Sequence, residues 1–168
     1  MHSEKQTIVY TSGSWDLFHV GHLNILEQSK KLGDILIVGV STDALVCDYK
    51  GMPPVILYED RCRIVASIRY VDRVVKQTAL TEIAQLKALD VDIVTIGSDW
   101  KERSLDGLDW FKQQPGKRVE YFDYTPGVST TSIKKRIIDN SYNIIEAELS
   151  RELKNMKNWH PPPDTSRA

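Results

Sequence analysis

Two histidines, His19 and His22, are the residues whose types and spacing point most directly to chemistry. They stand three residues apart around an expected helix start, so their rings share one face of that helix. The first turn of a helix offers unpaired backbone N–H groups to an anion, and Gly21 has no side chain to keep a phosphate away. Two imidazoles that donate to phosphate oxygens would stabilise the charge that builds up on five-coordinate phosphorus. The pair therefore predicts a phosphate-binding site.

The same spacing also fits a weak zinc site or two ordinary surface histidines. Zinc is disfavoured because no nearby Cys or His supplies further ligands. The two cysteines, Cys47 and Cys62, lie in no CxxC pattern. We expect both thiols to be reduced, in an intracellular setting.

A second segment suited to phosphate runs from Pro126-Gly127, which forms a turn, to Ser129, Thr130 and Thr131. These three residues offer hydroxyls and N–H groups at another expected helix start. Ordinary helix capping explains Ser and Thr there equally well. The chain contains neither the GxGxxG loop of dinucleotide-binding proteins nor a P-loop.

Short apolar runs alternate with helical patterns along most of the chain. The expected strands are residues 7–11, 35–40, 74–75, 92–96 and 118–122, and the expected helices are 20–32, 58–70, 80–89 and 131–139. Residues 43–57 have the composition of a loop. The alternation predicts an α/β, Rossmann-like fold: an open parallel five-stranded sheet with helices on both faces. Ligands of such sheets bind beyond the carboxyl ends of the strands.

The C-terminal part of the sequence has a different pattern. Residues 143–159 predict a C-terminal amphipathic helix with an apolar side: Ile144, Ile145, Leu149, Leu153 and Met156. This side either packs on the domain or forms a dimer contact. We therefore expect a catalytic domain at 1–140, a helical arm at 141–159 and a disordered tail at 160–168.

Composition excludes several classes of protein. The chain has 168 residues, with 22 basic and 23 acidic side chains and a formal charge of -1, so broad nucleic-acid binding is not expected. Its longest apolar stretch is far shorter than a membrane span. The first residues lack the apolar run of a signal peptide. A cytoplasmic protein with no nucleic-acid partner and no membrane span is the expectation.

Several motifs together identify a family. The stretch Gly-Ser-Trp-Asp-Leu-Phe-His-Val-Gly-His at 13–22 resembles the signature of the HxGH nucleotidyltransferases. Gly127 to Thr131 resembles the second signature of their cytidylyltransferase branch, and residues 69–72 and 97–100 are similar to that branch as well. The resemblance covers about residues 7 to 139 and is greatest to the glycerol-3-phosphate cytidylyltransferases.

The resemblance implies an activity. Such an enzyme transfers CMP from CTP to a phosphorylated small alcohol or polyol, releases pyrophosphate and needs Mg²⁺. The product would be a CDP-activated precursor for cell-surface polymers or lipids. Family members are commonly homodimers, and we expect one here.

The resemblance also assigns residues. Catalytic roles fall to His19, His22, Lys50 and Arg69. The nucleotide and its phosphates would be bound by Ser14, Trp15, Gly21, Arg61, Asp99, Gly127, Ser129, Thr130 and Thr131. The nucleotide phosphates would hold most of the magnesium shell, with Asp16 or Asp99 as further contacts. Asp16 would either cap the first helix, which is the favoured role, or order the loop.

Tyr124 and Pro126 stand where the cytidylyltransferase signature carries Arg and Glu. One alternative is therefore an adenylyltransferase that uses ATP and acts on a sugar 1-phosphate or on flavin mononucleotide. A second alternative is a nucleotide-binding regulatory module without turnover, which the presence of both histidines disfavours.

Overall fold

The computed structural model describes residues 5–157. Five strands form one sheet: β1 (Ile8–Gly13), β2 (Ile35–Ser41), β3 (Arg73–Gln77), β4 (Ile93–Gly97) and β5 (Arg118–Phe122). Every neighbouring pair is parallel, and the strand order is β3-β2-β1-β4-β5. The predicted five-stranded Rossmann-like sheet is confirmed. Because the order reverses between β1 and β4, the carboxyl ends of these two strands form the switch point at which ligands of such sheets bind.

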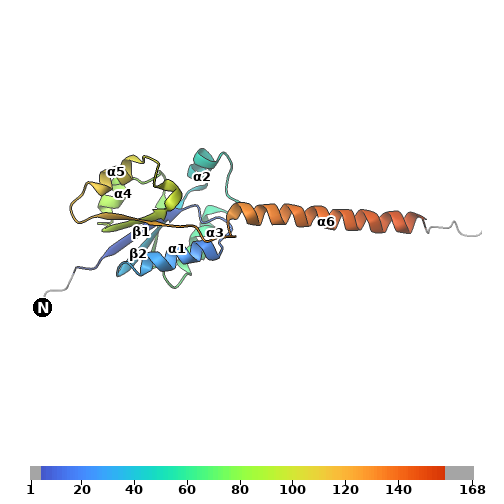
Figure 1. Cartoon of the computed structure of the whole chain (residues 1–168), viewed down its shortest axis with the longest axis horizontal. Helices are drawn as coiled ribbons and strands as arrows, with labels where there is room; N and C mark the ends of the chain where they lie inside the picture. The colour runs from blue at the N-terminus through green and yellow to red at the C-terminus, as the bar shows by residue number, and fades with distance from the viewer. Residues whose placement is uncertain (1–4, 158–168) are drawn as a thin grey trace, which may run out of the picture. The chain divides into compact units, whose positions relative to one another are not determined.

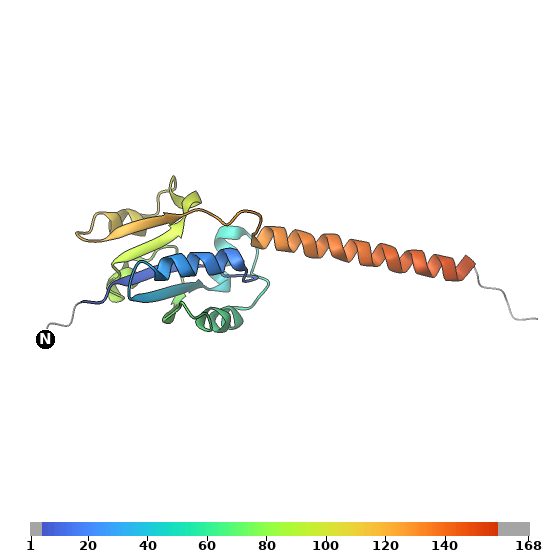
Figure 2. The same ribbon diagram turned by 60° about the horizontal axis from the view of Figure 1, so that its bottom comes forward.

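Helices cover both faces of the sheet (Figures 1 and 2). One face carries α1 (Val20–Lys30) and α3 (Tyr58–Ala66), and the other carries α4 (Ile83–Ala88) and α5 (Asp106–Lys112). Alternate residues of the central strands point to opposite faces. Val9 and Val38 therefore belong to the cluster under α1 and α3, whereas Tyr10 and Ile37 belong to the cluster under α4 and α5.

Residues 43–57 are not a single loop. Their first part forms α2 (Asp43–Lys50). The Thr42 side chain accepts a hydrogen bond from the Leu45 N–H, and Gly51 adopts the left-handed conformation with φ 74°. An N-cap hydroxyl and a left-handed glycine are the ordinary signals for the start and end of a helix. The helix makes Lys50 the last residue of a regular element.

The two helices predicted for the C-terminal part are one helix, α6 (Thr130–Lys157). No Gly or Pro interrupts these 28 residues. The polar residues Asn140, Ser141 and Asn143 lower helix propensity but leave the backbone hydrogen bonds intact. By its internal contacts the chain divides into two units, residues 1–130 and 131–168. A domain boundary at residue 140 stays a prediction, and the predicted disordered tail at 160–168 lies outside the described residues.

Candidate functional site

The loop between β1 and α1 (residues 14–19) holds three residues of the predicted site, Ser14, Trp15 and His19, at the carboxyl end of β1. Its backbone is unusual, because Trp15 and Leu17 have φ values of 54° and 46°. Side chains other than glycine rarely adopt this left-handed region, and surrounding contacts must hold them there. The loop leads into α1, whose N-cap is His19 in an extended conformation.

The two histidines are stacked on each other. The ring centroids of His19 and His22 lie 3.8 Å apart with 16° between the ring planes. Trp15 and Phe18 flank the His22 ring, each with its centroid 5.4 Å away. Within the described part of the chain, the buried Nδ1 atoms of His19 and His22 have no hydrogen-bond partner. A buried polar atom without a partner costs free energy, so this arrangement suits a ligand that supplies the missing partners.

The electrostatics of the pair keep both rings neutral. Burial, with contributions from His19 and Lys50, lowers the pKa of His22 from 6.5 to about 3. Burial also lowers the pKa of His19. Each neutral imidazole has one N–H to donate and one nitrogen to accept. An anionic ligand would favour the protonated forms and turn the pair into a stronger phosphate clamp.

Lys50 lies beside the loop. Its Nζ donates to the Ser14 hydroxyl over 3.1 Å, and its charge is one of the causes that lower the pKa of His22. The side chain is exposed, whereas Ser14 is buried. The structure thus brings Ser14, His22 and Lys50 together at the predicted site, with the ammonium at the solvent side.

Trp15 and Gly21 shape the loop from inside. The buried Trp15 indole donates from Nε1 to the Gly39 carbonyl over 2.9 Å. A Cβ at Gly21 would lie 3.0 Å from the His19 ring and 3.3 Å from Val128 Cγ1. The missing side chain at Gly21 therefore leaves space that the His19 ring and Val128 border, and the approach of a phosphate to Gly21 stays a prediction.

Arg61 is held by protein groups beside the loop. Its side chain is fully buried, and the guanidinium donates to the carbonyls of Ser14 and Ile56 and to the Asp43 carboxylate. These contacts tie the loop at residues 14–19 to the start of α2. They give Arg61 a positioning role, and its contact with a phosphate stays a prediction.

Asp16 does not cap α1. Its buried carboxylate accepts hydrogen bonds over 3.0 Å from the backbone N–H groups of Val55 and Ile56. The carboxylate therefore orders the segment that follows α2. The Asp16 carbonyl accepts from the Thr130 hydroxyl over 3.0 Å.

The second predicted segment reaches the first through residues 125–130. Asn24 of α1 donates to the Thr125 hydroxyl over 2.9 Å, and Gly127 makes its turn with φ 78°. Together with the Thr130–Asp16 contact, these interactions bring the hydroxyl-rich turn beside the histidine loop. Ser129 is exposed, and Thr131 is the first residue of the other unit.

Asp99 follows β4 in a short helix, η1 (Ser98–Trp100), and is exposed. Its carboxylate accepts a hydrogen bond from the Tyr124 hydroxyl over 2.8 Å. Burial and this contact raise the pKa of Tyr124. Gly97 gives the Tyr124 ring room, because a Cβ there would lie 2.9 Å from the hydroxyl. Tyr124 thus lies across the carboxyl end of β4, next to the switch point.

Arg69 lies elsewhere. It follows α3 near the amino ends of the strands, where the Asp72 N–H donates to the Leu36 carbonyl at the start of β2. The exposed Arg69 guanidinium donates to the Tyr70 hydroxyl over 2.6 Å. Its charge interacts with Glu27, which is two turns along α1 from His19. The structure does not bring Arg69 to the histidine pair.

Several polar residues at this edge carried no sequence motif. Gln77 at the end of β3 donates to the Ser12 hydroxyl over 3.1 Å and accepts from the Ser41 hydroxyl over 2.8 Å. Tyr49 of α2 lies near Ser41 and Ser14, and burial raises its pKa. Ser41 and Gln77 are polar residues that end the apolar strands β2 and β3, which is the signal that could have found them, whereas Tyr49 carries no such signal.

No three His, Cys, Asp or Glu side chains gather as a metal site within residues 5–154. Asp16 and Asp99 are both engaged in the contacts given above. Magnesium, held mainly by the nucleotide phosphates with Asp16 or Asp99 as further contacts, stays a prediction.

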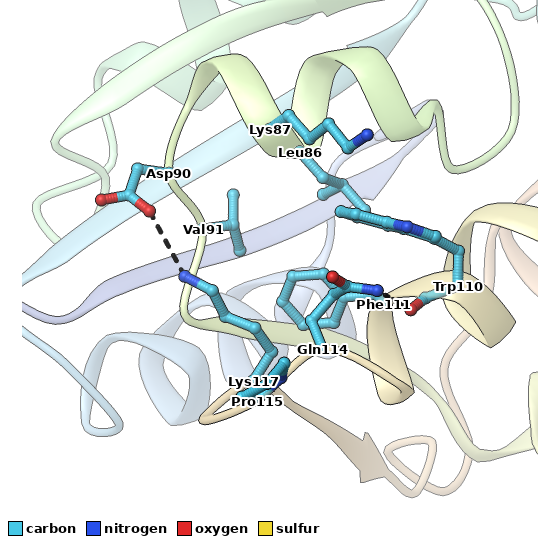
Figure 3. Close-up of a pocket in the computed structure, with 9 residues that line it drawn as sticks. All are labelled: Leu86, Lys87, Asp90, Val91, Trp110, Phe111, Gln114, Pro115 and Lys117. Carbon is cyan, nitrogen blue, oxygen red and sulfur yellow. Dashed lines mark hydrogen bonds and ion pairs between the residues drawn. The ribbon is translucent and has the colours of Figure 1, made fainter.

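A separate pocket of about 330 Å³ lies between α4 and α5 (Figure 3). Leu86, Val91 and Phe111 form its apolar lining, and Lys117 at its rim pairs with Asp90. Asp90 and Lys117 precede β4 and β5, so the pocket lies towards the amino ends of these strands. It is distinct from the histidine site.

Comparison with known proteins bears on these expectations. The sequence profile of the family described as Cytidylyltransferase-like matches residues 10–136. Curated relatives include the bifunctional protein HldE of Syntrophotalea carbinolica, 36% identical over 135 residues, and that of Helicobacter pylori, 37% identical over 134 residues. The alignments cover 80% and 79% of this chain, but only 27% and 28% of those proteins.

Solved structures support the fold. A lipopolysaccharide core biosynthesis protein from Thermoplasma volcanium superposes with a TM-score of 0.57 at 24% identity, covering 72% of this chain and 98% of that one. A putative nicotinate-nucleotide adenylyltransferase from Vibrio parahaemolyticus gives 0.57 at 14% identity, covering 81% and 89%.

These findings confirm the predicted nucleotidyltransferase, and they correct its subfamily. The curated relatives described above are HldE proteins, whereas the motifs resembled the glycerol-3-phosphate cytidylyltransferases. These similarities favour the predicted alternative, an adenylyltransferase, over the predicted cytidylyltransferase. No helix within residues 5–157 combines the length and hydropathy needed to cross a bilayer; a cytoplasmic location stays a prediction.

Proposed function

Because this chain belongs to the cytidylyltransferase-like family, we propose that it transfers AMP from ATP to a sugar 1-phosphate and releases pyrophosphate. Heptose 1-phosphate is the first acceptor to test. The similarity to HldE proteins supports ATP over CTP. The chain spans little more than a quarter of those relatives, so the proposal concerns this one reaction.

In the proposed reaction, an oxygen of the acceptor phosphate attacks the α-phosphorus of ATP. A new P–O bond forms as the bond from the α-phosphorus to the bridging oxygen breaks, and pyrophosphate leaves with the electron pair. No covalent enzyme intermediate is needed. The protein supplies position and charge stabilisation more than a strong base.

The observation that carries the proposal is the histidine pair. His19 and His22 leave two buried nitrogens without partners in the described structure, beside the Lys50 ammonium at the carboxyl end of β1. Phosphate oxygens of ATP would accept from the imidazole N–H groups. The interaction would strengthen as charge develops at the α-phosphorus.

The remaining predicted residues complete the proposed site. Lys50 would act as a point charge on the phosphates. Ser129, Thr130 and Thr131 would offer hydroxyls and N–H groups to the β- and γ-phosphates at the start of α6. Magnesium would enter as the ATP complex, since the described residues form no metal site of their own.

A pyrophosphate-release screen tests the proposal. ATP and CTP are each combined with heptose 1-phosphate, other sugar 1-phosphates and glycerol 3-phosphate. We expect release with ATP and a sugar 1-phosphate. Release of pyrophosphate only with CTP and glycerol 3-phosphate would support the cytidylyltransferase prediction instead. No release with any pair would contradict nucleotidyl transfer to these acceptors.

Variants assign the activity to the site. His19→Ala and His22→Ala each remove one donor, and we expect kcat to fall about 100-fold or more. Lys87→Ala is the control, because Lys87 lines the separate pocket between α4 and α5. Equal losses in all three variants would show that the histidines act only through general stability.

A further inference from the structure

Helix α6 carries an exposed apolar seam. Its members are Ile138, Tyr142, Ile145 and Leu149, whose side chains are 53%, 70%, 53% and 55% exposed. The spacings of four, three and four residues bring all four within an arc of about 60° at 3.6 residues per turn. Exposed side chains of this size, aligned along one line, mark a contact surface.

The width of the seam indicates what covers it. A helix that packs on a globular core shows an apolar stripe of about 100° or more, whereas a narrow line with spacings of three and four is typical of a helix that pairs with another helix. Two further exposed isoleucines, Ile137 and Ile144, lie on a different side of α6, and Leu153, 58% exposed, widens the apolar arc only to about 80°. The seam therefore suits a helical partner.

The charges along α6 are unevenly distributed. Lys134, Lys135 and Arg136 lie near its start, and over all its 28 residues six basic side chains stand against four acidic ones. From residue 139 to 154, however, α6 has four acidic side chains and only two basic ones, which gives a net charge of -2. Helices that bind anionic membranes carry mainly Lys and Arg on the polar side, and the stretch around the seam lacks this composition.

The seam is complementary to itself. Continued at the same spacing, it reaches Lys135 at one end and Glu152 at the other, both exposed. In an antiparallel pair, Lys135 of each copy faces Glu152 of the other. A parallel pair instead places Lys135 against Lys135 and Glu152 against Glu152. Opposite charges at matched seam positions set the orientation of paired helices.

We propose that α6 is a self-association element, in which the seams of two copies of this chain pair antiparallel. Ile138 packs on Leu149 of the second copy, and Tyr142 packs on Ile145 of the second copy. The pair also brings Asp139 near Glu146 of the second copy, but at solvent-exposed positions where a charge contact contributes little. The proposal is independent of the catalytic activity.

Sedimentation velocity on the full chain over a concentration series tests the apolar seam. We expect the wild type to be dimeric and Ile145→Glu to be monomeric at the same concentrations. Ile144→Glu is the matched control, since it makes the same change at an equally exposed isoleucine outside the seam, and it should remain dimeric. Far-UV circular dichroism checks that α6 stays helical in both variants.

Charge reversal tests the orientation. Lys135→Glu and Glu152→Lys each place like charges opposite each other in an antiparallel pair, so each should raise the dimer dissociation constant roughly tenfold. The double variant Lys135→Glu/Glu152→Lys should restore the wild-type dissociation constant. A monomeric wild type at all concentrations, equal loss of dimer in Ile144→Glu and Ile145→Glu, or no restoration in the double variant would each overturn the proposal.

Discussion

His22 is a half-buried base that the fold holds in its neutral form. The stacked His19 ring and the nearby Lys50 ammonium add to burial, and the pKa of His22 falls to about 3. In the unfolded chain a histidine titrates near 6.5. Between these values the unfolded state binds a proton that the folded state does not, so acidification favours unfolding over this window.

We therefore expect the free energy of unfolding to decrease as the pH falls from about 6.5 towards 3. His22→Gln removes this titrating group and should flatten that part of the pH profile. Urea unfolding of both proteins at pH 7.5, 6 and 5 measures the difference. Parallel profiles would mean that His22 protonates as readily in the folded state as in the unfolded chain.

Arg61 shows how one buried cation can organise a site. Its guanidinium joins the Ser14 carbonyl to the Asp43 carboxylate. Arg61→Lys keeps the charge but loses the forked donors, which leaves buried acceptors without partners. We expect a loss of roughly 2–4 kcal/mol in urea unfolding.

Arg69→Lys is the control for this change. Its guanidinium is exposed, and surface substitutions of this kind stay within about 0.5 kcal/mol. If the two variants lose the same stability, the buried contacts of Arg61 are not what holds the loop. A loss confined to Arg61→Lys supports its positioning role.

At the scale of elements, the first turn of α1 depends on Gly21. Alanine is favoured over glycine inside a helix by up to about 1 kcal/mol. A Cβ at this position would, however, press on the His19 ring at 3.0 Å and disturb its stack on His22. We expect Gly21→Ala to change the stability by less than about 1 kcal/mol, while a displaced ring lowers kcat by about tenfold or more.

Urea unfolding and the pyrophosphate-release assay separate these two effects. The double variant Gly21→Ala/Val128→Ala removes the second contact of the new Cβ, at 3.3 Å, but keeps the contact with His19. The double variant should recover the free energy of unfolding of the wild type, but its kcat should remain low. Full recovery of rate would place the effect on Val128 instead of the imidazole.

The elements of the sheet were predictable because apolar runs of strand length alternate with helical patterns. All five strands lie within two residues of their expected bounds. Helix α2 was missed although Thr42 and Gly51 carry the ordinary capping signals, because the Pro53-Pro54 pair that follows suggested a loop throughout. The sequence pattern predicted two helices where the structure has the single helix α6. Polar residues near position 140 lower the helix propensity, but they do not end the helix.

The site was predictable where local sequence determines it. The histidines and the Thr130 turn follow directly from motifs, and the contact between Thr130 and Asp16 joins them. The long-range contacts of Arg61 and Asp16 were not predictable. Ser14 and Asp43 lie 47 and 18 residues from Arg61, the partners of Asp16 lie 39 and 40 residues from it, and all become neighbours only in the fold. Such long-range pairing has no local pattern.

At the scale of the whole molecule, we expect the stability of the sheet and the proposed self-association to depend on different parts of the chain. The buried residues of both core clusters lie between Val9 and Phe111, and all five strands end by Phe122. Among the side chains that the structure describes, those of α6 from residue 144 to 154 belong to neither cluster. The core of the sheet therefore does not require the second half of α6.

A chain that ends at residue 143 separates these two roles. It keeps both core clusters, so it should unfold in urea with a free energy at infinite dilution within about 1 kcal/mol of the wild-type monomer. It lacks Ile145, Leu149 and Glu152, so its sedimentation should be monomeric at every concentration. Because a dimer gains apparent stability from mass action, the wild type should gain stability with concentration while the shortened chain does not. A shortened chain that unfolds without cooperativity would mean that the sheet depends on α6 directly, and one that remains dimeric would place the contact between copies outside the seam.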